Sequence, residues 1–143
     1  FAQNLAKNKN ILHIIEPDLR EIHFGDWEAK TTEHLWKGQK NQLMAFWDDP
    51  INNMPPNAES LEGFQARVNA VFERITHAKN EKNTHILVIA HGGVIRQIIA
   101  NILSIPHSKA QLMQVDYGSM SQIGCYDGHL SIGCINLNSL RSE

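Results

Sequence analysis

Residues 86–96, ILVIAHGGVIR, contain the side chain best placed to do chemistry. An apolar run ends at His91, two glycines follow, and an amphipathic stretch begins. Ligands of open α/β sheets bind beyond the carboxyl ends of the strands, which is the position of His91. Gly92 and Gly93 let the backbone approach a ligand closely, and amides at a helix start favour an anion. This chemistry suits phosphate, although a histidine at such a junction can equally serve only as a cap. Arg96, off the apolar face, is expected to be solvated or salt-bridged.

Residues 19–28, LREIHFGDWE, supply a second reactive group, the carboxylates of Glu21, Asp26 and Glu28. Like charge raises the pKa of a carboxylic acid beside a phosphate dianion, so such an acid can deliver a proton to a leaving oxygen. The segment is irregular around Gly25, which is a common setting for site residues. Taken alone, these carboxylates are more simply explained as surface groups of a loop.

The elements that must position these side chains alternate between helix and strand. Residues 1–10 have the pattern of a helix end, and apolar periodicity predicts further helices and two buried strands. The helices are expected at 31–48 with a break near Gly38, directly after the N-cap residue Ser60, and at 93–103, and the strands at 11–15 and 85–90. This order predicts one domain over residues 1–143, a three-layer α/β/α sandwich with a mostly parallel sheet.

The C-terminal part predicts an antiparallel hairpin that adds to this sheet. Two alternating stretches flank an Asp-Gly pair at 127–128, which is a strong signal for a two-residue turn. In the register set by that turn, Cys125 faces Leu130 and Cys134 faces Ser121. The two cysteines then lie too far apart for a disulfide, so both thiols are expected to be free. Two cysteines without a disulfide framework are typical of the reducing cytoplasm.

Composition excludes several classes of function. The chain has 42% hydrophobic and 20% charged residues and a formal net charge of -2, which is typical of a globular domain and argues against general nucleic-acid binding. No apolar run approaches the roughly 18 residues of a membrane span. The spacing of the eight histidines and two cysteines gives no metal motif, which leaves a histidine metal site as a weak alternative. We therefore expect a small-molecule ligand and no metal, nucleic acid or membrane.

Together these stretches resemble the histidine phosphatase superfamily, also called phosphoglycerate mutase-like. LREIHFGDWE is similar to the family's acidic segment, NAESLEGFQARV to the Glu-Ser stretch before a helix that carries an arginine, and VIAHGGVIR to the second-histidine motif. YGSMSQI is similar to the polar stretch that opens the last hairpin. The resemblance follows the family's order over nearly the whole chain. Within the family it is greatest to the α-ribazole phosphatases of cobalamin nucleotide-loop assembly.

The resemblance implies a phosphomonoesterase that works through a phosphohistidine intermediate, without metal or cofactor, on a small phosphorylated metabolite. It implies that Glu21 is the proton donor and acceptor, and that His91 is the second histidine, which holds a phosphoryl oxygen. It also implies that the Gly92 amide contacts phosphate and that Glu59 and Ser60 lie at the substrate rim, although capping alone is favoured for Ser60. A phosphoglycerate mutase-like enzyme and a broad-specificity phosphatase are the alternatives within the family.

One family motif has no counterpart in the chain. The Arg-His-Gly sequence at the end of the first strand, which carries the nucleophilic histidine, is absent, as is the arginine-bearing segment after it. These 143 residues alone are therefore expected to be inactive and to leave strand edges unpaired. We expect residues before Phe1, or a second copy of the chain, to fill the gap. The alternative is a non-catalytic protein that binds phospholigands.

Overall fold

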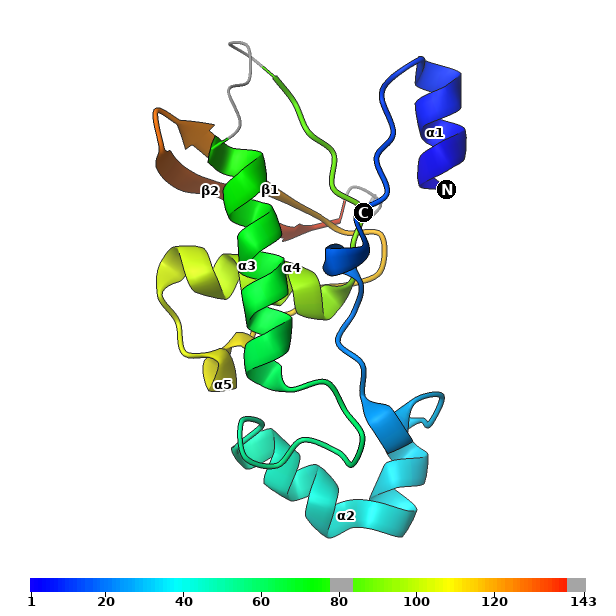
Figure 1. Ribbon diagram of the computed structural model, residues 1–143. Helices are drawn as coiled ribbons and strands as arrows, with labels where there is room; N and C mark the ends of the chain where they lie inside the picture. Colours follow the sequence, from blue (N-terminus) through cyan, green and yellow to red (C-terminus); the bar gives the residue numbers. More distant parts are fainter. Residues whose placement is uncertain (78–83, 139–143) are drawn as a thin grey trace.

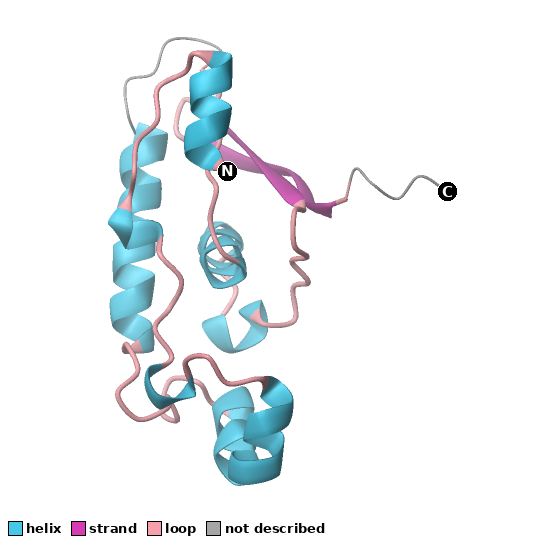
Figure 2. Cartoon of the chain, turned by 90° about the vertical axis from the view of Figure 1, so that its right-hand side faces the viewer, coloured by secondary structure: helices cyan, strands magenta, loops and turns pink. Residues whose placement is uncertain are grey.

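The computed structural model describes residues 1–77 and 84–138, and its centre is a pair of contacting helices, α3 and α4 (Figure 1). The elements run α1 (Ala2–Lys9), η1 (Pro17–Leu19), η2 (Gly25–Trp27), α2 (Thr32–Asp48), α3 (Leu61–His77), α4 (Gly92–Leu103), α5 (His107–Ala110), β1 (Met120–Tyr126) and β2 (His129–Leu137). In both ribbon views α2 lies at one end of the molecule, while α1 and the β1–β2 hairpin lie towards the other (Figure 2). No helix in this described part combines the length and apolar character that crossing a membrane requires.

The main core forms where the apolar faces of α3 and α4 meet. Ser60 starts α3, because its Oγ accepts a hydrogen bond from the Gly63 amide at 3.1 Å, as the predicted N-cap requires. Val68 of α3 and Val94 of α4 are both fully buried. The buried cluster consists of Ile22, Leu61, Phe64, Val68, Phe72, Val94 and Ile98. Because Ile22 belongs to it, the segment that carries Glu21 is anchored to the same core as α4.

A second, smaller core joins α2 to the turn around Gly25. α2 is kinked at Gln39, next to the predicted break at Gly38, and Gln39 Oε1 accepts a hydrogen bond from Trp27 Nε1 at 2.7 Å. Gly25 has φ of 55°, and a Cβ built on it would lie 2.1 Å from the carbonyl oxygen of Pro56. Only glycine fits this position, where the loop before α3 crosses the turn.

The C-terminal hairpin is confirmed, with one change of register. Cys125 pairs with Leu130 as predicted, and both residues of the Asp-Gly turn have positive φ. Cys134 pairs with Gln122 and not with Ser121, so that part of the predicted register is wrong. The cause is a bulge, which adds a residue to one strand and shifts the pairing beyond it. Both cysteines are free thiols, as predicted.

The two predicted parallel strands do not form a ladder in this structure. Residues 11–15 and 84–90 lie outside every strand of the described chain, in which β1 and β2 make the one sheet. Their large apolar side chains are exposed: Leu12 is 85% exposed and Leu87 is 62% exposed. The prediction of strands here is therefore wrong for this structure. The physical reason is that a strand needs a neighbour for its backbone, and neither run has one among the described residues.

Candidate active site

The carboxylate of Glu21 lies at the N-terminus of α4. Its Oε2 accepts a hydrogen bond from the Gly93 amide at 3.0 Å, and its Oε1 accepts one from the Ile22 amide at 3.1 Å. Because α4 begins at Gly92, directly after His91, this contact joins Glu21 to the first turn of the helix that follows His91. The structure thus joins the acidic segment and the histidine motif at one helix end.

Helix geometry explains why a carboxylate is stable there. The first amides of a helix have no partner within it, and the helix dipole favours negative charge at that end. Gly93 makes room for the contact, since a Cβ built on it would lie 2.3 Å from Glu21 Oε1. A Cβ on Gly92 would meet only the mobile end of Arg96, with Nη1 at 3.1 Å. Close approach of the carboxylate therefore depends on glycine at position 93.

His91 is exposed, and its ring is not used by the fold. Its backbone is extended, with φ of -103° and ψ of 164°, and its carbonyl oxygen accepts the Ile95 amide at 3.0 Å. The side chain makes no capping hydrogen bond, so the capping alternative for this histidine does not hold. Its ring has no hydrogen-bond partner within the described parts of the chain, which leaves both ring nitrogens open to a ligand.

A cavity of about 170 Å³ lies beside this helix end. Its lining includes the polar side chains of Glu21, Arg96 and Gln111 together with Gly93, and most of its other lining residues are apolar. The half-buried side chain of Arg96 donates from Nε to the Met113 carbonyl oxygen at 2.8 Å. It has no carboxylate partner among the described residues, so the salt bridge considered for it is not formed there.

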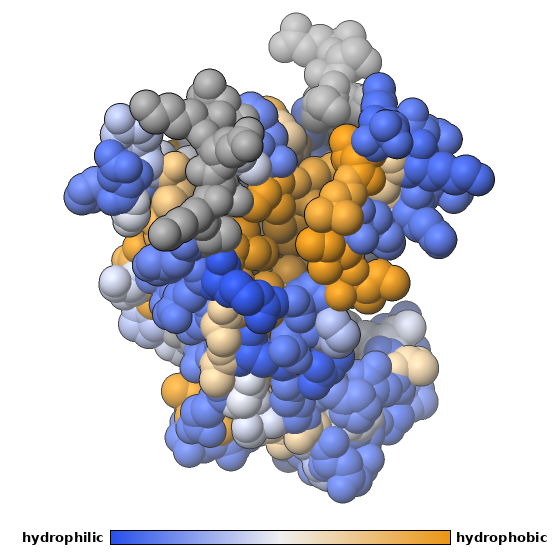
Figure 3. Space-filling model, turned by 45° about the horizontal axis from the view of Figure 1, so that its top comes forward, coloured by the Kyte–Doolittle hydropathy of each residue, from blue (hydrophilic) through white to orange (hydrophobic). Residues whose placement is uncertain are grey.

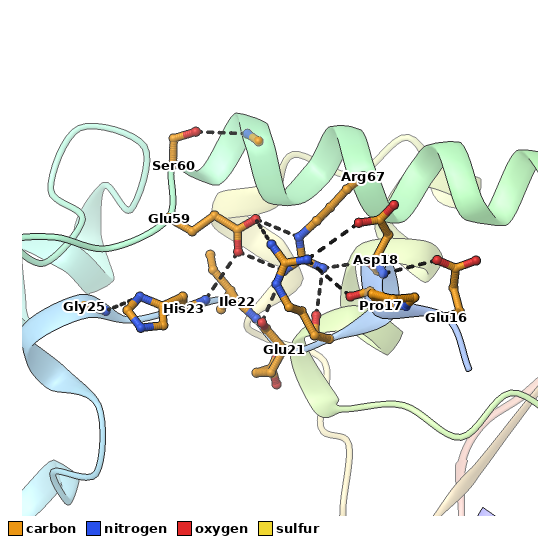
Figure 4. Close-up of polar contacts among 12 residues, drawn as sticks. Glu16, Pro17, Asp18, Glu21, Ile22, His23, Gly25, Glu59, Ser60 and Arg67 are labelled. Atoms are coloured by element: carbon orange, nitrogen blue, oxygen red, sulfur yellow. Dashed lines mark hydrogen bonds and ion pairs between the residues drawn. The ribbon is translucent and has the colours of Figure 1, made fainter. Parts of the chain in front are cut away.

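Glu59 lies close to Glu21 but is bound to an arginine of α3 (Figure 4). Arg67 donates from Nε to Glu59 Oε1 at 2.6 Å and from Nη2 to Glu59 Oε2 at 2.8 Å. The hydrogen bonds from Arg67 hold the pKa of Glu59 below its ordinary value, with a smaller contribution from the His23 amide, and the same Glu59–Arg67 hydrogen bonds raise the pKa of Arg67. Both side chains are largely buried. Ser60, the other predicted rim residue, is exposed and caps α3.

Comparison with known proteins identifies the family. The family model of the histidine phosphatase superfamily (branch 1) matches residues 1–138. The chain belongs to the histidine phosphatase superfamily. It is 27% identical over 135 residues to an adenosylcobalamin/alpha-ribazole phosphatase of Salmonella typhimurium, covering 94% of this chain and 66% of that protein. It is 28% identical over 129 residues to the Escherichia coli protein of that name, covering 90% of this chain and 63% of the relative.

A solved structure agrees with this assignment. The crystal structure of the alpha-ribazole phosphatase from Shigella flexneri superposes with a TM-score of 0.78 at 25% identity, covering 95% of this chain and 66% of the other. The fold is therefore that of the phosphoglycerate mutase-like α/β proteins, with the hairpin at its C-terminal end. The chain spans slightly less than two thirds of the length of these relatives.

The other two candidate carboxylates of this histidine phosphatase chain do not reach the helix end. Glu28 Oε1 accepts a hydrogen bond from the Phe24 amide at 2.7 Å, and Asp26 Oδ1 accepts one from Asn57 Nδ2 at 3.0 Å. Both hold the turn around Gly25 against its neighbours. Of the three, Glu21 alone is bound at the start of α4. Among the described residues, no group of three or more His, Cys, Asp or Glu side chains could hold a metal ion.

Sequence reasoning did not assign a site role to Arg67, although a signal was present. Arg67 lies three residues after Phe64 and one before Val68, so it falls beside the buried face of α3. A charged residue so placed needs a partner, because burying an unpaired charge is costly. Glu59, which precedes the helix, is that partner.

Proposed function

We propose that the protein is a phosphomonoesterase that transfers the phosphoryl group to a histidine and then to water. The observation that carries this proposal is the meeting of Glu21, Gly93 and His91 at the start of α4. An anion-binding helix end, a carboxylic acid and an unbonded imidazole within one small region suit phosphate-ester cleavage. The fold assigned to the family supports the same reaction class.

In the proposed reaction the nucleophilic histidine forms a bond to phosphorus while the bond to the leaving oxygen breaks. Glu21, as the carboxylic acid, gives its proton to that oxygen, and the alcohol departs. Water then attacks the phosphohistidine, its proton passes to the Glu21 carboxylate, and phosphate is released. His91 and the Gly92 amide donate hydrogen bonds to the phosphoryl oxygens, on which negative charge accumulates. The residues assigned to these steps require no metal.

The substrate we propose is α-ribazole 5'-phosphate or a close relative, in cobalamin nucleotide-loop assembly. The names of the relatives support it. The cavity next to Glu21 does too, because its lining also contains the apolar side chains of Phe24, Phe46, Met54, Leu61 and Phe64. Such a lining favours a leaving group with a flat apolar ring over the small, charged phosphoglycerate of a mutase. We place the reaction in the cytoplasm, on the ground of the two free thiols.

We propose further that a segment preceding Phe1 supplies the nucleophilic histidine and a strand. Residues 11–15 and 85–90 are mostly apolar, are largely exposed and lie in no strand of the described chain, so an extended segment would pair with their backbones and cover their side chains. Figure 3 shows apolar surface gathered around a hollow on the face that it draws. A second copy of the chain is the alternative occupant, and a phospholigand-binding protein without a nucleophile is the alternative function.

Two measurements test this proposal. Reading the gene upstream of Phe1 should show an in-frame Arg-His-Gly, and its absence there would refute the proposed source of the nucleophile. The full-length gene product should release phosphate from α-ribazole 5'-phosphate, and His91→Ala should lower kcat by about 10²- to 10³-fold. His34→Ala, which changes an exposed residue of α2, is the matched control and should behave as the wild type. An unchanged kcat in His91→Ala would refute the role of His91.

A further inference from the structure

The side chain of Arg67 binds the backbone of the irregular segment that carries Glu21 (Figure 4). Arg67 Nη1 donates to the carbonyl oxygens of Asp18 at 2.6 Å and of Arg20 at 2.8 Å. Its Nη2 donates to the carbonyl oxygen of Glu21 at 3.2 Å. Three backbone acceptors within four residues thus converge on a single guanidinium group.

Glu59 fixes the guanidinium and also holds the far side of the same segment. It binds Arg67 through both carboxylate oxygens, and its Oε2 accepts the His23 amide at 3.4 Å. The Glu59 amide in turn donates to the His23 carbonyl oxygen at 2.9 Å. The guanidinium carbon lies 4.9 Å from the centre of the Phe64 ring, so the arginine is also packed against α3. The pair therefore fixes the chain on both sides of Glu21 and Ile22.

These contacts supply the backbone hydrogen bonds that a helix or a strand would otherwise provide. η1 ends at Leu19 and η2 starts at Gly25, so residues 20–24 belong to no helix, and they lie in no strand of the described chain. Backbone carbonyls in such a segment need donors from elsewhere. Arginine supplies five N–H donors in a rigid fork, whereas lysine offers a compact ammonium group that cannot reach three carbonyls and a carboxylate in the same geometry.

We infer that Arg67 is a positioning residue, which holds the backbone of Glu21 so that its carboxylate reaches the start of α4. The inference rests on the proposed role of Glu21 as proton donor. A displaced proton donor harms the release of a poor leaving group, which needs the proton, more than that of a good one, which departs as an anion. A merely structural role of Arg67 would lower the rates of both reactions equally.

The test compares Arg67→Lys with Arg74→Lys in the full-length gene product. Arg74 is a matched control on the same helix, because it also pairs with a carboxylate, that of Glu16, but is exposed. With glycerol phosphate, whose leaving alkoxide is poor, Arg67→Lys should lower kcat/KM by about 10²-fold. With p-nitrophenyl phosphate the loss of kcat/KM, which reports only the steps up to departure of the leaving group, should be much smaller. Arg74→Lys should match the wild type, and equal losses of kcat/KM on the two substrates would overturn the inference.

A second measurement does not depend on activity. The Gly93 amide lies in the first turn of α4, where it has no partner within the helix, so its hydrogen exchange reports on the contact with Glu21. Arg67→Lys should speed exchange at Gly93, whereas Arg74→Lys should not. Unchanged exchange in Arg67→Lys would overturn the inference. A wild-type protein that releases no phosphate would instead refute the proposed function, and exchange at Gly93 would still decide whether Arg67 positions Glu21.

The variant Glu59→Gln distinguishes two roles for Glu59, which either fixes Arg67 or contacts the substrate. If Glu59 acts by fixing Arg67, the variant lowers kcat on glycerol phosphate and leaves KM unchanged. An increase of KM alone would assign Glu59 to the substrate rim and would count against its part in positioning Glu21.

Discussion

The α3–α4 core and the runs at 11–15 and 85–90 are similarly rich in apolar residues. They differ in how far their side chains are exposed to solvent in the folded chain. Val68 is 0% exposed and Ile99 1%, whereas Ile15 is 78% exposed and Leu87 62%. A helix satisfies its own backbone hydrogen bonds, so α3 and α4 need only each other to bury their apolar faces. A strand depends on a neighbouring strand for its backbone, and these runs belong to no sheet of the described chain.

This difference shows which part of the site is independent of the sheet. Glu21 is fixed by α3 through Arg67 and by α4 through Gly93, and neither contact involves residues 11–15 or 85–90. His91 follows one of these runs directly, but its backbone carbonyl is already part of α4. The part of the candidate site that joins Glu21 to the start of α4 is therefore organised by helices.

The largest expected effect on stability comes from truncating one side chain in each region. Phe64, 1% exposed, lies in the core, and Phe64→Ala should lower the free energy of unfolding by about 3–5 kcal/mol. Leu87→Ala should change it by less than about 0.5 kcal/mol in residues 1–143, because the side chain is exposed. Urea denaturation followed by circular dichroism measures both values.

The same two variants in the full-length gene product show whether the proposed strand covers the run that contains Leu87. Phe64→Ala should cost as much as before, whereas Leu87→Ala should now cost about 2–5 kcal/mol, because the proposed strand buries its side chain. If Leu87→Ala stays neutral in the full-length protein, no segment packs on residues 84–90, and the proposed completion of the sheet is wrong.

The helices were easier to predict from the sequence than the sheet, because a helix satisfies its own backbone hydrogen bonds and a strand does not. The spacing of Leu61, Phe64 and Val68 contains all that α3 needs, and the capping bond of Ser60 was predicted from its position. The run at 85–90 was equally clear as an apolar pattern, but its partner is not among the described residues. The hairpin was predicted because its turn is local, and its register was wrong only beyond the bulge. The Arg67 contacts could not be predicted, because they join Arg67 to carbonyl groups up to 49 positions away in the sequence.

A smaller effect is expected on activity. It tests whether the reaction depends on the contact between the Glu21 carboxylate and the start of α4. Gly93→Ala places a Cβ where the Glu21 carboxylate lies, so the carboxylate must move. We expect kcat on glycerol phosphate to fall by about 10²-fold in the full-length gene product. Gly38→Ala is the control, because a Cβ there meets nothing within 4 Å. Equal activity of the two variants would show that the contact seen here is not used in the reaction.

The smallest expected effect is the pH dependence of stability that the Glu59–Arg67 pair contributes. The pKa of Glu59 is lowered in the folded protein, first by its hydrogen bonds with Arg67, from an ordinary value of 4.5. A lowered pKa means that the pair's contribution is fully present above the unfolded value and is lost as the pH falls through the folded value. The free energy of unfolding should therefore decrease by on the order of 1 kcal/mol as the pH falls below that range. Urea denaturation at several pH values measures this decrease.

Glu59→Gln should remove this part of the pH dependence, because glutamine does not titrate. Glu73→Gln, an exposed change on the same helix, should keep it. If the acid dependence in Glu59→Gln equals that of the wild type, the Glu59–Arg67 pair does not contribute to it.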